Sequence, residues 1–224
     1  MGQGVKQWRS AGAVLGALTM ILCVQSGHAA RPDSSRMRTI LVLGDSLSDG
    51  FTLRRSEAYP ALLVEKLRQA GLSYEVMNAS ASGGTSEGGV RRLPAHLKRR
   101  IDIFILQLGI NDLFLGVPVD EIQNNLQAII DKVKQRNPNV RIVIAGMKLP
   151  NAENDDRVAD FARMYVNLAA RNETALVPYL LEGVGGDPLL NLPDRLHPNA
   201  AGQRRVAENV WRVLEPIARE VANL

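Results

Sequence analysis

The chain has 224 residues, enough for one domain of ordinary size with a continuous hydrophobic core. Its 27 lysines and arginines against 23 aspartates and glutamates give a formal net charge of +4, too close to balance to indicate a nucleic-acid-binding protein. The single cysteine, Cys23, excludes a disulfide within the chain, so the fold depends on packing.

The first predicted element is a secretory signal peptide over residues 1–29. Lys6 and Arg9 precede an uncharged, mostly apolar run from 11 to 24, and the small residues Gly27 and Ala29 follow. The run is shorter than the ~20 residues of a membrane-spanning helix, so we expect cleavage rather than a retained anchor. The cut is expected after Ala29, with a cut after Ala30 as the alternative. Cleavage removes two of the 27 basic residues and no acidic one, which leaves 25 against 23 and a net charge of +2.

Residues 30–224 are predicted to form one domain in which short apolar runs alternate with amphipathic stretches. The runs predict buried strands at 39–43, 103–108 and 140–145, and weaker ones at 74–77 and 175–177. Apolar residues at helical spacing predict helices at 57–69, 87–99 and 121–136, and two more that contain 158–168 and 206–221. Gly71 and Asn137-Pro138 are expected to end the first and third of these helices.

This alternation predicts an α/β fold, a three-layer α/β/α sandwich with a five-stranded parallel sheet. In the flavodoxin-like order 2-1-3-4-5, ligands bind at the carboxyl edge of the sheet, between the first and third strands. Ser46 follows the first strand in Gly44-Asp45-Ser46-Leu47, and Asn111 follows the third in Gly109-Ile110-Asn111-Asp112. Both motifs are therefore expected at the same edge.

A serine at this place suggests a nucleophile, which needs a general base. The chain has three histidines. His28 lies in the predicted signal peptide, and His96 lies on a predicted helix without a patterned carboxylate, so His197 is the candidate base. Asp194 precedes it by three residues, close enough to orient the imidazole, although a simple turn aspartate is the alternative.

Four segments together resemble the four sequence blocks of the SGNH (GDSL) hydrolases, in the same order. They are Gly44–Leu47, Asn78–Ser86, Gly109–Asp112 and Asp194–Pro198. Arg92–Ala95 and Lys148–Asn151 are further similar to the bacterial periplasmic thioesterase/lysophospholipase and arylesterase branch. The resemblance implies the fold above, a catalytic triad of Ser46, Asp194 and His197, and no cofactor.

The resemblance also implies an oxyanion hole formed by the Ser46 backbone N–H, the Gly83 backbone N–H and the Asn111 side chain. Gly84 leaves the choice between the two glycines open, and many relatives have Asp at that position. Asp45, Asp49 and Asp112 are expected to serve in turns and helix caps rather than in catalysis. No cluster has metal-ligand spacing, and no phosphate-binding glycine loop is present.

Two apolar loops and one segment similar to that branch predict an acyl-chain groove, with packing as ordinary core as the alternative. The candidate substrate-binding residues are Leu113, Phe114, Leu149, Pro150, Leu190 and Leu192. The basic run of Arg91-Arg92 and Lys98–Arg100 is interpreted as a solvated helix face, with an anionic headgroup site as the alternative.

The predicted function is hydrolysis of acyl esters and thioesters, with arylesterase, acyl-CoA thioesterase and lysophospholipase activities. The expected location is the periplasm of a Gram-negative bacterium, and the expected state is a monomer or weak oligomer with no partner beyond a small-molecule substrate and no stable membrane anchor. A carbohydrate O-acetylesterase and a non-catalytic envelope binding module are the alternatives.

Overall fold

The computed structural model describes residues 1–4, 37–149 and 154–224. Nearly all of the predicted signal peptide lies outside these residues, and so does Pro150. Met1–Arg31 and Pro32–Leu224 form separate units, and the fold below is that of the second. None of the helices in the described ranges combines the length and the apolar character that a membrane span requires.

The centre of the domain is a five-stranded sheet in the order β2-β1-β3-β4-β5, with every neighbouring pair parallel. All seven residues of β1 and all five of β3 are buried, as continuous apolar runs in a sheet covered on both faces require. The strands span β1 Arg38–Gly44, β2 Tyr74–Asn78, β3 Ile103–Gln107, β4 Arg141–Ala145 and β5 Ala175–Val177. The predicted strand order is confirmed.

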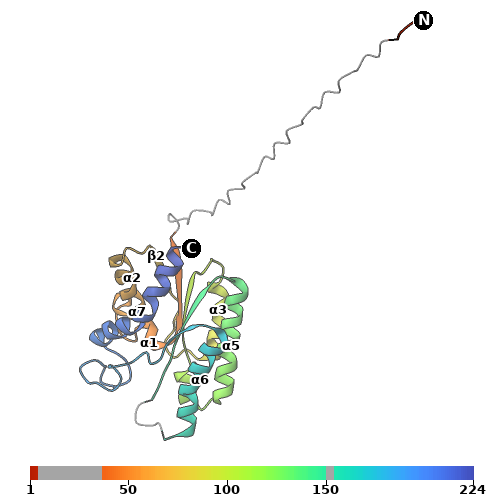
Figure 1. The fold of residues 1–224 in the computed structure, drawn as a ribbon. Coiled ribbons are helices and arrows are strands. Elements are labelled where there is room, and N and C mark those ends of the chain that lie inside the picture. Colours follow the sequence, from red (N-terminus) through yellow and green to blue (C-terminus); the bar gives the residue numbers. More distant parts are fainter. Residues whose placement is uncertain (5–36, 150–153) are drawn as a thin grey trace. The chain divides into compact units, whose positions relative to one another are not determined.

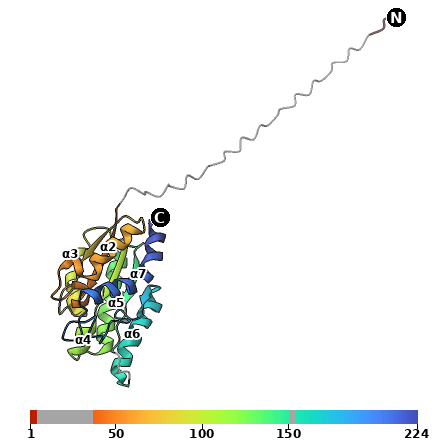
Figure 2. The ribbon, with the colours of Figure 1, turned by 90° about the vertical axis from the view of Figure 1, so that its left-hand side faces the viewer.

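Helices cover both faces of this sheet (Figures 1 and 2). On one face α2 packs against α7, and on the other α3 packs against α5, which contacts α6. Two short helices, α1 and α4, follow β1 and β3 directly and were not predicted. The helices span α1 Ser46–Asp49, α2 Tyr59–Gln69, α3 Ser86–His96, α4 Ile110–Phe114, α5 Val119–Arg136, α6 Asp156–Asn172 and α7 Ala200–Ala222.

The predicted helix bounds differ from the structure by a few residues, each for a local reason. The helix predicted from Glu57 begins at Tyr59, because Arg55–Glu57 form a separate 3-10 turn (η1). The helix predicted to reach Arg99 ends at His96, two residues beyond a proline inside the helix. The helix predicted from Glu121 begins two residues earlier, directly after a proline.

Parallel strands bring the motif residues to one edge of the sheet. Ser46 follows β1, Gly83 follows β2 and Asn111 follows β3, so all three lie beyond the carboxyl ends of neighbouring strands. Gly109 begins the turn after β3 with φ +124, and a Cβ there would lie 2.7 Å from the Tyr165 hydroxyl. Only glycine fits this turn.

Candidate active site

Ser46 is the first residue of α1 and is 7% exposed. Asp45 caps this helix, because its Oδ1 accepts a hydrogen bond from the Leu47 N–H at 2.9 Å. A Cβ on Gly44 would lie 2.5 Å from Ser48 Oγ and 2.7 Å from Gln107 Oε1, so the chain here closes against its neighbours too tightly for any side chain. The sharp turn from strand to helix leaves the Ser46 side chain at the edge of the sheet.

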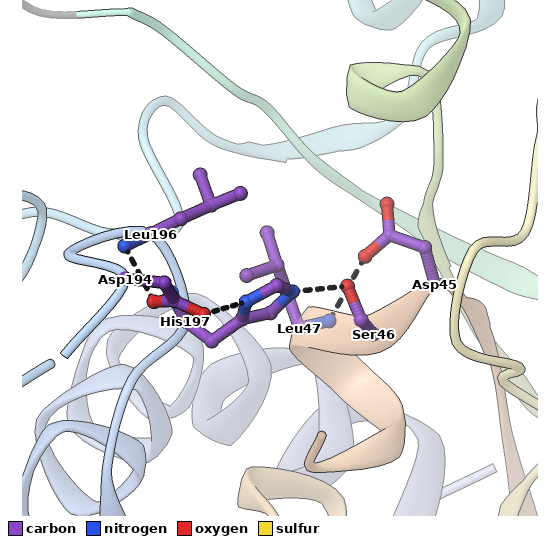
Figure 3. A network of polar contacts seen from close by, with 6 residues as sticks. All are labelled: Asp45, Ser46, Leu47, Asp194, Leu196 and His197. Atoms are coloured by element: carbon purple, nitrogen blue, oxygen red, sulfur yellow. Dashed lines mark hydrogen bonds and ion pairs between the residues drawn. The ribbon is translucent and has the colours of Figure 1, made fainter. Parts of the chain in front are cut away.

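His197 and Asp194 reach Ser46 from the loop before α7 (Figure 3). Asp194 Oδ1 accepts from the backbone N–H groups of Leu196 and His197 at 2.9 and 3.0 Å, which forms a tight turn around the carboxylate. Its Oδ2 lies 2.7 Å from His197 Nδ1, and His197 Nε2 lies 2.9 Å from Ser46 Oγ. With Nδ1–H donating to Asp194, Nε2 is the nitrogen that accepts from the serine hydroxyl.

The charge on Asp194 is favoured by this turn. Desolvation raises the pKa of the carboxyl, but hydrogen bonds from the His197 backbone, the imidazole and the Leu196 backbone outweigh it and lower the pKa to about 2. The carboxylate is thus ionised at neutral pH. An ionised partner keeps the proton on Nδ1 and leaves Nε2 free to take the proton of Ser46.

The residues proposed as oxyanion donors lie at the same edge of the sheet. The N–H of Gly84 donates to the Ala81 carbonyl at 2.9 Å, whereas no described atom accepts from the N–H of Gly83. Gly83, whose φ of +73 only glycine adopts easily, therefore stays the proposed backbone donor. Asn111 Nδ2 donates one proton to the Gly84 carbonyl at 2.9 Å, which holds the amide against this loop with its second proton available.

The model of the GDSL-like lipase/acylhydrolase family matches residues 42–205, which contain all four predicted sequence blocks. The chain belongs to the GDSL-like lipase/acylhydrolase family. This confirms the resemblance seen in the motifs.

Curated members of the family are similar along most of their length. The chain is 37% identical over 203 residues to the esterase TesA of Pseudomonas aeruginosa, covering 90% of this chain and 96% of TesA. It is 34% identical over 180 residues to the thioesterase 1/protease 1/lysophospholipase L1 of Escherichia coli K12, covering 80% and 84%. A crystal structure of TesA superposes with a TM-score of 0.76 at 39% identity, covering 80% of this chain and 99% of that one. The chain is therefore a serine hydrolase of the esterase and thioesterase group.

Beneath the GDSL motif lies a buried polar network that the sequence patterns did not reveal. Gln107 Nε2 donates to Asp45 Oδ2 at 2.9 Å, and its Oε1 accepts from the Asp45 N–H and from Ser48 Oγ. Gln203 of α7 accepts from the Tyr59 N–H and donates to the Leu47 carbonyl. The available signal for Gln107 was that it is the one polar residue within the apolar run 103–108. The network joins α1 and its capping residue to β3, α2 and α7 around the nucleophile turn.

Three further side chains hold the loop between β2 and α3. Asp112 accepts from the N–H and the hydroxyl of Ser86, and Asp49 accepts from the N–H and the hydroxyl of Ser82. Arg92 is half-buried and donates to the carbonyls of Gly44 at 2.5 Å and Ala79 at 3.4 Å. The interpretation of the basic run as a solvated helix face is therefore wrong for Arg92, which is turned inward to satisfy backbone carbonyls.

The predicted acyl-groove residues differ in exposure. Phe114 is 53% exposed, and Leu149, Leu190 and Leu192 are half-buried. Leu113 is 4% exposed and packs in the core, which agrees with the alternative of ordinary core packing for this residue. Leu115 and Leu189, which belong to the two apolar segments of the sequence prediction, are 72% and 80% exposed, and Phe51, which that prediction did not include, is 39% exposed. The described residues contain no group of three or more His, Cys, Asp or Glu side chains placed to hold a metal ion.

Proposed function

We propose that Ser46, His197 and Asp194 are the catalytic triad with which this protein hydrolyses acyl esters and thioesters. The alignment of Ser46 Oγ, the imidazole and the Asp194 carboxylate, at 2.9 and 2.7 Å, is the observation that carries the proposal. A non-catalytic binding module does not need these three groups in one line.

In the first half-reaction, His197 Nε2 takes the proton of Ser46 as Oγ attacks the carbonyl carbon of the substrate. The carbonyl oxygen gains the negative charge, and the N–H groups of Ser46 and Gly83 and the amide of Asn111 donate to it. His197 then returns the proton to the departing alcohol or thiol. Water attacks the acyl-Ser46 ester in the same way, with His197 again as base, and releases the carboxylic acid.

We infer a substrate with an apolar acyl group and either an oxygen or a sulfur leaving atom. Phe114 and Leu115 lie at the end of the helix that carries Asn111, and Leu189 lies in the segment before His197, so exposed apolar side chains are close in the chain to two of the proposed catalytic groups. The printed names of relatives, an esterase, an arylesterase and a thioesterase/lysophospholipase, support this class.

The test is hydrolysis of p-nitrophenyl esters from acetate to palmitate by residues 30–224, with Ser46→Ala as the blank. Ser46→Ala is expected to lose at least about 10⁴-fold in kcat while its circular dichroism and Tm stay unchanged. Retained turnover would end the assignment of the nucleophile. A maximum at medium or long chains, followed by cleavage of acyl-CoA and lysophospholipid, supports the acyl-groove proposal. Activity confined to acetate would replace it with a carbohydrate deacetylase.

We also propose that residues 1–29 direct export to the periplasm and are then removed. The basic flank, the short apolar run and the small residues before Ala30 support this proposal. Full-length chain expressed in a Gram-negative host should appear in the periplasmic fraction, with Ala30 or Arg31 as the first residue by N-terminal sequencing. An intact N-terminus in the membrane fraction would indicate a retained anchor. Sedimentation of the mature chain tests the expected monomer or weak oligomer.

A further inference from the structure

Phe51 lies against the imidazole of His197, although nothing in the motif pattern assigns it a role. The two ring centroids are 4.4 Å apart, and the ring planes are inclined by 32°, so the contact is closer to face-to-face than to edge-on. Phe51 is 39% exposed, so part of this residue remains open to solvent while its ring lies against the imidazole. A partly exposed aromatic ring on a triad residue calls for a functional explanation.

The backbone holds Phe51 in this place with a short, tightly closed turn. Gly50 ends α1 with φ +83, and the N–H groups of Gly50 and Phe51 both donate to the Ser46 carbonyl at 3.1 Å. A Cβ on Gly50 would lie 2.7 Å from the Ala58 Cβ, so glycine is required there. Thr52 has φ +62, a left-handed conformation that a β-branched residue rarely adopts. This strained turn therefore fixes the position of the Phe51 ring.

The hydrogen bonds of His197 leave one motion of its imidazole weakly restrained, namely tilting out of the ring plane. Its loop has no helix or strand apart from the isolated bridge of Asn191 with Pro198, and the hydrogen bonds of its ring go to Asp194 and Ser46. Both bonds lie at ring nitrogens and restrain the imidazole within its own plane. Tilting out of that plane moves Nε2 away from Oγ, and a stacked ring opposes that motion.

We propose that Phe51 is a positioning residue for His197. Its ring keeps the imidazole aligned between Asp194 and Ser46, and its electron-rich face favours the imidazolium that forms as Ser46 loses its proton. The inference rests on the proposed function, because it assigns Phe51 a part in the same proton transfer. The effect on the rate lies in kcat rather than in substrate binding.

The experiment compares Phe51→Leu, which keeps an apolar side chain but removes the ring face, with Phe51→Tyr, which keeps the face. Phe51→Met serves if the leucine variant does not fold. Trp211→Leu is the matched control, because Trp211 is a partly buried aromatic residue on α7 that contacts Lys66 and has no place in the site. For each variant, kcat and KM are measured on p-nitrophenyl acetate and octanoate, and a fluorophosphonate probe counts competent Ser46.

We expect Phe51→Leu to lower kcat by about 3- to 30-fold on both esters, the range that a cation–aromatic contact supports. KM should change by less than about 2-fold, the tyrosine variant should regain wild-type kcat, and Trp211→Leu should match the wild type. Unchanged kcat in Phe51→Leu, a tyrosine variant as slow as the leucine one, or a loss in KM that grows with acyl length would each overturn the proposal. Absence of turnover in the wild type would instead overturn the proposed function.

Discussion

Replacing Asp45 with asparagine tests what a fully buried carboxyl does beside the nucleophile. Burial raises the pKa of Asp45 from its ordinary 3.8 to about 7, although hydrogen bonds from Leu47 and Gln107 and the charge of Arg92 act in the opposite direction. The folded protein therefore holds this proton more tightly than the unfolded chain does. The resulting stability is fully present below pH 3.8 and is lost as the pH rises through about 7.

The magnitude follows from the pKa values. At 1.36 kcal/mol per pKa unit, the rise from 3.8 to about 7 corresponds to about 4 kcal/mol of unfolding free energy lost between pH 4 and pH 8. Asparagine does not ionise, so the variant lacks this loss. Its NH₂ group would meet Gln107 Nε2, a second donor, and the failed hydrogen bond costs about 1–3 kcal/mol at every pH. Asp45→Asn should therefore be less stable than the wild type at pH 4 and more stable at pH 8.

The assay is urea unfolding of residues 30–224 at half-unit steps from pH 4 to pH 8, followed by the fluorescence of Trp211, which is the only tryptophan after residue 29. Subtracting the unfolding free energy of Asp45→Asn from that of the wild type at each pH cancels the contributions of the other titratable groups. Asp160→Asn, at an exposed site on α6, reports the effect of removing one surface charge. If the unfolding free energies of the wild type and Asp45→Asn differ by a constant amount from pH 4 to pH 8, the reasoning that burial raises the pKa of Asp45 is refuted.

Three other substitutions have clear expected outcomes. Asp194→Asn places an NH₂ group against His197 Nδ1, which then has to accept and shifts the proton to Nε2. We expect kcat to fall by about 10³- to 10⁴-fold with little change in Tm, and a loss below 10-fold would contradict the orienting role. Asn111→Ala removes one oxyanion donor and should lower kcat by about 10²- to 10³-fold with a smaller effect on KM in steady-state assays. Gly109→Ala drives a methyl group into the buried tyrosine hydroxyl on α6 and should cost about 3 kcal/mol or more in urea unfolding. Gly71→Ala is its control, because Gly71 also has positive φ but nothing within 4 Å of a Cβ, and equal losses for both would mean that the clash is unimportant.

Local patterns in the sequence were sufficient to predict all five strands and the five longer helices of the fold. The continuous apolar run of β1 and the 3.6-residue period of α5 each depend on neighbours within one element, and both elements form where predicted. The errors lie at element ends, such as the start of α2, where a 3-10 turn competes with the helix. Short helices such as α1 and α4 were missed because four or five residues contain too little of a period to detect.

The four motif blocks were likewise sufficient to name the residues of the candidate site. Ser46 and His197 are 151 residues apart in the chain, and the family pattern alone predicts that they belong to one site. Spacing alone placed Asp194 within reach of His197, since a turn of three residues returns a side chain to its own backbone.

Only the tertiary structure decided what surrounds those residues. It shows the N–H of Gly84 bonded to the Ala81 carbonyl, buries Leu113 in the core, and sets the ring centroids of Phe51 and His197 4.4 Å apart. Each outcome depends on the direction of a single side chain or N–H group relative to a segment that is remote in the chain or lies across a tight turn. Sequence periodicity specifies which face of an element is apolar. It does not specify which atoms of remote segments contact that face. Those tertiary contacts determine the burial of each side chain, its hydrogen bonds and the raised pKa of Asp45.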